Sequence, residues 1–149
     1  MKLHVYLDTS IISAYFDERL KERQTETRRF WKRIGDFDVS TAEITRQEIL
    51  QTTDGNLKSK MEGLIEGFSI HSLTEEMQGL AQRYVDSGVF TPVMRNDALH
   101  VAASVLTRQD ILLSWNFKHL VNRRRRAKVN DVNISLGLPT IEILSPPEI

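Results

Sequence analysis

The apolar residues of the chain fall into short continuous runs that alternate with longer stretches in which apolar positions recur every three or four residues. Short apolar runs are typical of buried strands, and the three-to-four spacing is typical of helices with one packed face. The runs predict strands at 3–7, 37–40, 68–73, 110–115 and 141–144. The periodic stretches predict helices at 10–16, 20–34, 42–51, 57–66, from Met77 through Val85, at 97–107, and in the basic segment after residue 115.

Hydroxyl residues mark the start of two of these helices. Thr9 or Ser10 is expected to cap the first helix, because a side-chain oxygen there accepts from a free backbone N–H. Ser72 and Glu75 have the spacing of a capping box, which predicts that the helix through Met77 begins beside them.

Strands that alternate with helices favour parallel pairing, because each connection crosses a face of the sheet. The sequence therefore predicts an α/β protein with a three-layer α/β/α arrangement around a parallel central sheet, in a single domain over residues 1–149. Ligands of such open sheets bind beyond the carboxyl ends of the strands. Polar residues that follow a predicted strand are thus the first candidates for a site.

Composition narrows the class of protein. With 40% hydrophobic residues, 27% charged residues and no apolar run near the ~18 residues of a membrane span, the chain is predicted to be globular and not membrane-bound. There is no cysteine, which excludes disulfides, thiolate zinc sites and cysteine nucleophiles. Asp8 interrupts the first apolar run and no signal-peptide cleavage pattern follows, so a cytoplasmic location is expected.

The charges balance, with 20 basic and 20 acidic residues, so any binding of nucleic acid must rely on a local patch. One basic run stands out, and it is either a solvated helix end or a surface that contacts RNA phosphates. It comprises Lys118, Arg123, Arg124, Arg125, Arg126 and Lys128.

Asp8 directly follows the first predicted strand. It is either a helix cap or part of a site, and the neighbouring Thr9 and Ser10 can also cap the helix. Its place at the carboxyl end of a strand favours the site.

Glu48 lies in a segment with two capping-box patterns, Ser40 with Glu43 and Thr45 with Glu48. Only one pattern can open the helix. If Ser40 does, Glu48 lies beside the apolar side of the helix, where a carboxylate usually has a partner.

Asp97, His100 and Asn116 complete the set of candidates. Asp97 opens an alanine-rich helix, where it is either an N-cap or a carboxylate that the helix N-terminus keeps ionised. His100 lies on the same helix face and is more often a packed, hydrogen-bonded residue than a ligand. Asn116 follows the strand at 110–115 and offers an amide oxygen or a hydrogen bond.

Together, these carboxylates and the amide sit at strand ends or early helix positions, which a parallel sheet brings to one edge. Mg²⁺ and Mn²⁺ take oxygen ligands and few protein carboxylates, so the set is compatible with such an ion. The sequence has neither a P-loop nor G-x-G-x-x-G. Thr9 and Ser10, rather than a second acid, follow Asp8, which argues against an aspartyl-phosphate phosphotransferase.

Four segments resemble the motifs of the PIN-domain family, in particular the VapC-like ribonuclease toxins. YLDTSIISAYF is similar to the family's first strand with D-[TS]-[SN], and ITRQEIL to the segment with its second acid. NDALHVAASV resembles the third motif, and ILLSWNF resembles the fourth. The order and spacing match over nearly the whole chain, although Asn116 stands where the fuller acidic set has an acid.

The resemblance implies a Mg²⁺- or Mn²⁺-dependent nuclease that cleaves single-stranded RNA. It implies Asp8, Glu48, Asp97 and Asn116 as catalytic residues, with Asp8, Asp97 and Glu48 as metal ligands. Ser10 and Ser114 resemble the small hydroxyl residues that hydrogen-bond acids or water in such sites. Arg123, Arg124, Arg125 and Arg126 would contact backbone phosphates.

Two functions stay open. The first is an endoribonuclease that acts as the toxin of a toxin–antitoxin pair, with a small antitoxin protein as its partner. The alternative is an RNA- or protein-binding PIN module with an impaired active site, which Asn116 favours because it removes one negative charge. The helices predicted at 20–34 and 57–66 either offer faces for a homodimer or simply pack on the core.

Overall fold

The computed structural model describes all residues from Met1 to Ile149 and contains one sheet of five parallel strands. The strands lie in the order β3-β2-β1-β4-β5. Their bounds are β1 Leu3–Leu7, β2 Phe37–Ala42, β3 Ser69–His71, β4 Ile111–Leu113 and β5 Glu142–Leu144. The five predicted strands and their parallel pairing are confirmed.

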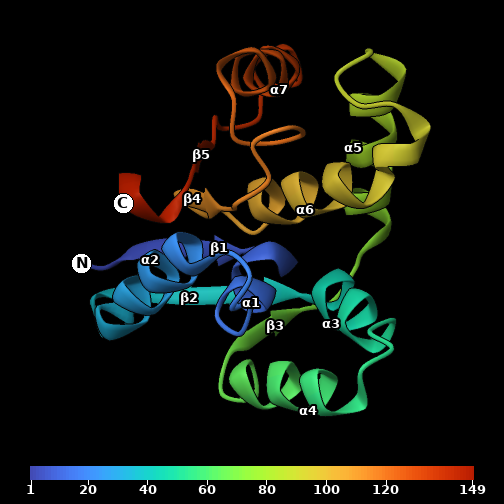
Figure 1. Cartoon of the computed structure of the whole chain (residues 1–149). Helices are drawn as coiled ribbons and strands as arrows, with labels where there is room; N and C mark the ends of the chain where they lie inside the picture. The colour runs from blue at the N-terminus through green and yellow to red at the C-terminus, as the bar shows by residue number, and fades with distance from the viewer.

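Helices cover both faces of the sheet, as predicted for a three-layer α/β/α protein (Figure 1). Their bounds are α1 Thr9–Ala14, α2 Lys21–Lys32, α3 Glu43–Leu50, α4 Gly55–Leu64, α5 Glu75–Asp86, α6 Arg95–Leu106 and α7 Arg123–Ser135. Three short 3₁₀ helices lie at Ile34–Asp36, Pro92–Met94 and Pro146–Glu148. No helix combines the length and the apolar composition needed to cross a membrane.

Two hydrophobic cores follow from the alternation of side chains along the central strands. Val5 and Leu7 of β1 face the layer of α1, α2 and α4, where Phe30 and Met61 pack against them. Tyr6 of β1 faces the other layer, which α5, α6 and α7 form. The predicted helices at 20–34 and 57–66 thus contribute to the core through α2 and α4.

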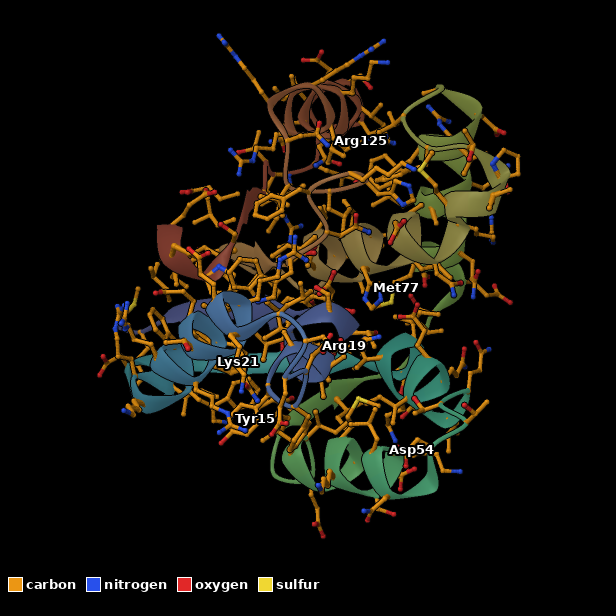
Figure 2. The ribbon with its side chains drawn as sticks, viewed as in Figure 1. Tyr15, Arg19, Lys21, Asp54, Met77 and Arg125 are labelled. Atoms are coloured by element: carbon orange, nitrogen blue, oxygen red, sulfur yellow. The ribbon has the colours of Figure 1, made fainter.

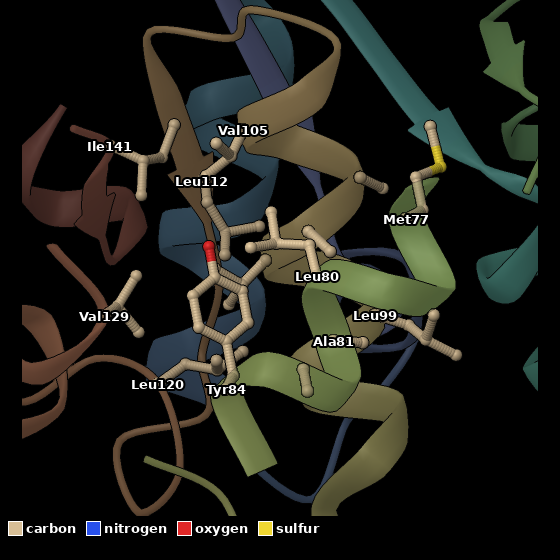
Figure 3. Packing of buried hydrophobic residues seen from close by; sticks show 14 of the residues in the cluster. Met77, Leu80, Ala81, Tyr84, Leu99, Val105, Leu112, Leu120, Val129 and Ile141 are labelled. Carbon is tan, nitrogen blue, oxygen red and sulfur yellow. The ribbon is translucent and has the colours of Figure 1, made fainter. Parts of the chain in front are cut away.

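The second core is closed by side chains of α5 and α6 that meet over β4 (Figure 3). Leu80 and Tyr84 of α5 pack close to Leu112 of β4, beside α6. The Tyr84 hydroxyl also donates to Asn133 Oδ1 at 2.5 Å, which ties α5 to α7. The basic helix α7 is therefore held firmly against this layer.

The order of the strands places a topological switch point at the carboxyl end of β1. The chain proceeds outward from β1 through β2 to β3, and then returns to β4 on the other side of β1. A crevice at such a point is where open α/β sheets bind ligands. Asp8 follows β1 at this edge, and Asn116 follows β4 there.

The hydroxyl caps predicted for α1 and α5 are wrong, whereas the alternative of Asp8 as a helix cap is confirmed. Asp8 itself caps α1, since it is still extended (φ −82°, ψ 175°) and accepts from the backbone N–H of Ser10 at 3.0 Å, whereas Thr9 is already helical. Thr74, not Ser72, caps α5, because the helix begins later than expected and the Thr74 side chain accepts from the N–H of residue 77. The chosen residues were correct in type but lay one or two positions from the true boundary.

Neither capping box predicted for α3 is formed. The strand β2 continues to Ala42, which makes Ser40 a sheet residue paired with Tyr6. Ala42 occupies the N-cap position without a side-chain hydrogen bond. The Thr45 hydroxyl instead accepts from the hydroxyl of Thr41 at 2.7 Å. Glu48 is thus not engaged in a cap and is available for other partners.

Candidate active site

Asp8 is held in place by two serine residues at the switch point. It is only 4% exposed, and its Oδ1 accepts from the backbone N–H of Ser10 at 3.0 Å and from the Ser10 hydroxyl at 2.5 Å. Its Oδ2 accepts from the Ser114 hydroxyl at 2.6 Å. The Ser10 hydroxyl in turn accepts from the N–H of Trp115 at 2.8 Å. This network joins the ends of β1 and β4, and it gives Ser10 and Ser114 the acid-bonding contacts that the sequence resemblance implied.

Glu48 and His100 form a hydrogen-bonded pair across the edge of the sheet. His100 Nε2 lies 2.7 Å from Glu48 Oε1, and its Nδ1 lies 2.8 Å from the Tyr6 hydroxyl. The Thr9 hydroxyl donates to the same Glu48 oxygen at 2.5 Å. His100 is 2% exposed, so it is the packed, hydrogen-bonded histidine that the sequence favoured.

The charges of this pair stabilise each other. Burial opposes ionisation of Glu48, but the hydrogen bond and charge of His100, with further hydrogen bonds from Thr9 and Asn96, lower the pKa of Glu48 overall. Burial likewise opposes protonation of His100, but the hydrogen bond and charge of Glu48, together with the charges of Asp8 and Asp97, raise the pKa of His100. All three carboxylates therefore favour the protonated form of His100, and Glu48 is the one that contacts it.

Asp97 lies in the first turn of α6 and not at its cap position, which Met94 occupies. Its Oδ2 is 2.9 Å from Nδ1 of His119, and the Asn116 side-chain amide donates to its Oδ1 at 3.5 Å. The Asn116 Oδ1 accepts from the backbone N–H of His119 at 2.9 Å. Asn116 therefore orients both Asp97 and the turn that carries His119.

The three carboxylates share one edge of the sheet but do not form a ready cage for a metal. No group of three or more His, Asp or Glu side chains is placed to hold an ion. Mg²⁺, however, is commonly held by one or two carboxylates, with water and substrate phosphate completing its shell. Asp8 at the end of β1 and Asp97 in the first turn of α6 would supply two such carboxylates at this edge. The donor set therefore fits Mg²⁺ or Mn²⁺ with few protein ligands, and does not fit a closed structural site.

The buried charge of Asp8 gives a prediction for stability. Burial raises the pKa of Asp8 above its ordinary value of 3.8, although His100, Ser10 and Ser114 oppose the shift. The folded chain thus holds the Asp8 proton more tightly than the unfolded chain. The free energy of unfolding therefore falls as pH rises from the ordinary pKa of Asp8 through its raised pKa in the folded chain. Without metal, Asp8→Asn should therefore increase the free energy of unfolding at pH 7.5 by about 1 kcal/mol, which raises the melting temperature by ~3 °C.

The measurement is thermal denaturation in EDTA from pH 4 to pH 8, monitored by circular dichroism. The gain should shrink toward pH 4, where Asp8 of the wild type becomes protonated. A variant that melts below the wild type across the whole range would contradict this account of Asp8.

The four arginines of the basic run divide into two pairs with different contacts. Arg125 donates to the Val89 carbonyl oxygen, and its guanidinium lies 4.9 Å from the centre of the Phe90 ring. Figure 2 shows it at the side of α7 that faces α6. Arg126 pairs with Glu148 at 3.1 Å. Arg123 and Arg124 are exposed and have no such partner.

Sequence reasoning missed His119 and Thr9 as members of this edge. His119 had a local signal, because an asparagine three residues before it can accept from its backbone N–H and form a turn. Thr9 was considered only as a cap, whereas its hydroxyl reaches Glu48, 39 positions away in sequence. Only the folded sheet brings Thr9 and Glu48 together.

No protein-family model and no curated protein matches the sequence. The fold, by contrast, occurs in solved toxin–antitoxin structures. VapBC-1 of nontypeable Haemophilus influenzae matches with a TM-score of 0.64 and 14% identity, over 97% of this chain and 99% of that chain. VapBC2 of Rickettsia felis, bound to a DNA fragment from its promoter, matches with a TM-score of 0.60 and 12% identity, over 96% of this chain and 98% of that chain.

A toxin–antitoxin complex from Klebsiella pneumoniae matches with a TM-score of 0.59 and 15% identity, over 81% of this chain and 93% of that chain. The chain thus shares its fold with these VapBC and toxin–antitoxin structures. The three-layer fold predicted from the sequence is confirmed.

Proposed function

We propose that the chain is a metal-dependent endoribonuclease that cleaves single-stranded RNA, as the toxin of a toxin–antitoxin pair. The observation that carries the proposal is the placement of Asp8, Glu48 and Asp97 at the switch-point edge of the sheet, where hydrogen bonds hold each of them. Carboxylates at such an edge are the ligands that Mg²⁺ or Mn²⁺ takes in phosphodiester hydrolysis. The matched toxin–antitoxin structures support an antitoxin protein as the partner.

In this proposal, the residues at the edge of the sheet have separate roles in binding the metal, accepting a proton and positioning the carboxylates. Asp8 and Asp97 would hold Mg²⁺, which supplies positive charge to the phosphate and makes a water easier to deprotonate. Glu48, held by His100 and Thr9, would accept the proton of the attacking water or complete the ion's shell. Asn116 and His119 would orient Asp97, and Ser10 and Ser114 would orient Asp8.

The direct test is cleavage of a labelled single-stranded RNA by the purified protein with Mg²⁺, with Mn²⁺ and with EDTA. Cleavage is expected with either metal and should stop in EDTA, because the carboxylates alone lack the charge that stabilises the transition state. Cleavage that persists unchanged in EDTA would overturn the proposal. A duplex of the same sequence serves as the control for strand preference.

A binding module without activity is the second candidate. It is favoured by the side-chain amide of Asn116, which donates to Asp97 where a fuller acidic set would offer another oxygen. The melting temperature separates the two candidates, since an ion that binds the folded chain stabilises it. A nuclease should melt several degrees higher in millimolar Mn²⁺ than in EDTA, whereas an unchanged melting temperature would favour the module.

A further inference from the structure

Phe117 is an exposed aromatic residue that lines one hollow of the surface and directly follows Asn116, which lines another. It is 44% exposed, and its ring lies 5.3 Å from the guanidinium of Arg23. Arg23 also lies over Trp115, at 5.5 Å, and lines a hollow of about 270 Å³ together with Ser10 and Asn116. This first hollow therefore opens beside the residues that hold Asp8 and Asp97.

The second hollow is strongly basic. Its volume is about 510 Å³, and Phe117 forms part of its wall. Four cationic side chains line it and no carboxylate does: Lys118, Arg124, Arg125 and Lys128. Arg125 is bound to the wall through the Val89 carbonyl oxygen, so the others supply the mobile charge. A hollow of this kind suits the phosphates of a polyanion.

The backbone turn that carries Phe117 is fixed by hydrogen bonds to its carbonyl oxygens and to that of the preceding residue. The carbonyl oxygen of Asn116 accepts from the backbone N–H of Leu120 at 2.9 Å and of Val121 at 2.8 Å. The Asn122 side chain donates to the carbonyl oxygens of Phe117 at 2.9 Å and of residue 118 at 3.2 Å. A rigid aromatic ring loses little freedom when a flat ligand stacks on it.

We propose that Phe117 is a stacking platform for a base of single-stranded RNA, and that the strand continues from the carboxylate edge into the basic hollow. The exposed ring would take one base, and Lys118, Arg124 and Lys128 would take the phosphates that follow. Aromatic platforms flanked by basic grooves bind single strands without a fixed sequence, because every base has a flat face. A duplex hides those faces. This inference rests on the proposed function and specifies how its substrate is held.

The experiment is fluorescence anisotropy with a labelled 12-nucleotide RNA in EDTA, so that binding is measured without cleavage. Phe117→Ala should weaken binding about 10-fold, whereas Phe117→Trp should bind at least as tightly as the wild type. Ile134→Ala is the matched control, because Ile134 is 64% exposed on α7 and lies outside both hollows. Phe117→Ala that binds as the wild type does, or a wild type that binds duplex as tightly as single strand, would overturn the platform.

A second pair of variants tests the path into the basic hollow. Arg124 lines the hollow and Arg123 does not, yet both are exposed and carry the same charge. Arg124→Gln should reduce the slope of log K against log salt by about 0.7, the value for one phosphate contact on a single strand, and Arg123→Gln should reduce it less. Equal reductions would reject the path.

The outcomes also separate this inference from the proposed function. A wild type that cleaves RNA, with Phe117→Ala binding equally well, rejects only the platform. A wild type that neither binds nor cleaves single-stranded RNA rejects both. Thermal melting of each variant checks that its fold is retained, which the exposure of Phe117 favours.

Discussion

Asp97→Asn should lower the rate of RNA cleavage by about 10³-fold. The reason is that a metal ion supplies several kcal/mol of charge stabilisation in the transition state, and each ~1.4 kcal/mol corresponds to a factor of ten. Asparagine keeps the shape of the side chain and an oxygen that can meet His119 and Asn116. The charge is therefore the main property that changes. The rate is measured under single-turnover conditions with a labelled RNA and saturating Mg²⁺.

The matched control is Asp36→Asn, which removes the same charge from an exposed residue directly before β2, at the opposite edge of the sheet. Its cleavage rate should stay within about twofold of the wild type. Asp97→Asn should also lose most of the stabilisation by Mn²⁺, because one of two proposed ligands has lost its charge. A variant that keeps more than a tenth of the activity would exclude Asp97 as a principal ligand.

The positions of the strands and helices along the chain could be predicted from sequence, because the pattern that identifies each element is local. Parallel strands covered on both faces, such as Leu3–Leu7 and Ile111–Leu113, are short apolar runs, and the helices between them show their packed face as a periodic stripe. The rule that sites lie at the carboxyl ends of strands then selected Asp8 and Asn116 without any knowledge of contacts. The strand order itself is not contained in that pattern.

The exact ends of the strands and the contacts between distant side chains could not be predicted from such local patterns. β2 extends to Ala42, two residues beyond the predicted end, because pairing with β3 keeps Thr41 and Ala42 extended. Such pairing overrides the local preference of Ser40 for a cap. Contacts such as Ser114 with Asp8, 106 positions apart, depend on the order of strands and leave no trace in a short window of sequence.

The Glu48–His100 pair is expected to matter for stability as much as for chemistry, because it joins α3 to α6. His100→Ala removes a buried ring together with its hydrogen bonds to the Tyr6 hydroxyl and to Glu48, which keeps only the Thr9 and Asn96 hydrogen bonds. We expect a loss of about 3 kcal/mol in the free energy of unfolding, or ~6–12 °C in the melting temperature. Tyr6→Phe is the control, because it removes one hydroxyl but keeps the packing, and should cost about 1 kcal/mol.

The pH dependence of that loss identifies its electrostatic part. The pKa of His100 is raised, so its contribution is complete below its ordinary value of 6.5 and is lost as pH rises through the folded value. The pKa of Glu48 is lowered, so its contribution is complete above its ordinary value of 4.5 and is lost as pH falls. In EDTA, the difference between wild type and His100→Ala should therefore be largest between pH 4.5 and 6.5 and should decrease on both sides. A difference that stays constant from pH 4 to pH 9 would assign the whole effect to packing, and the pair would then carry no net charge interaction.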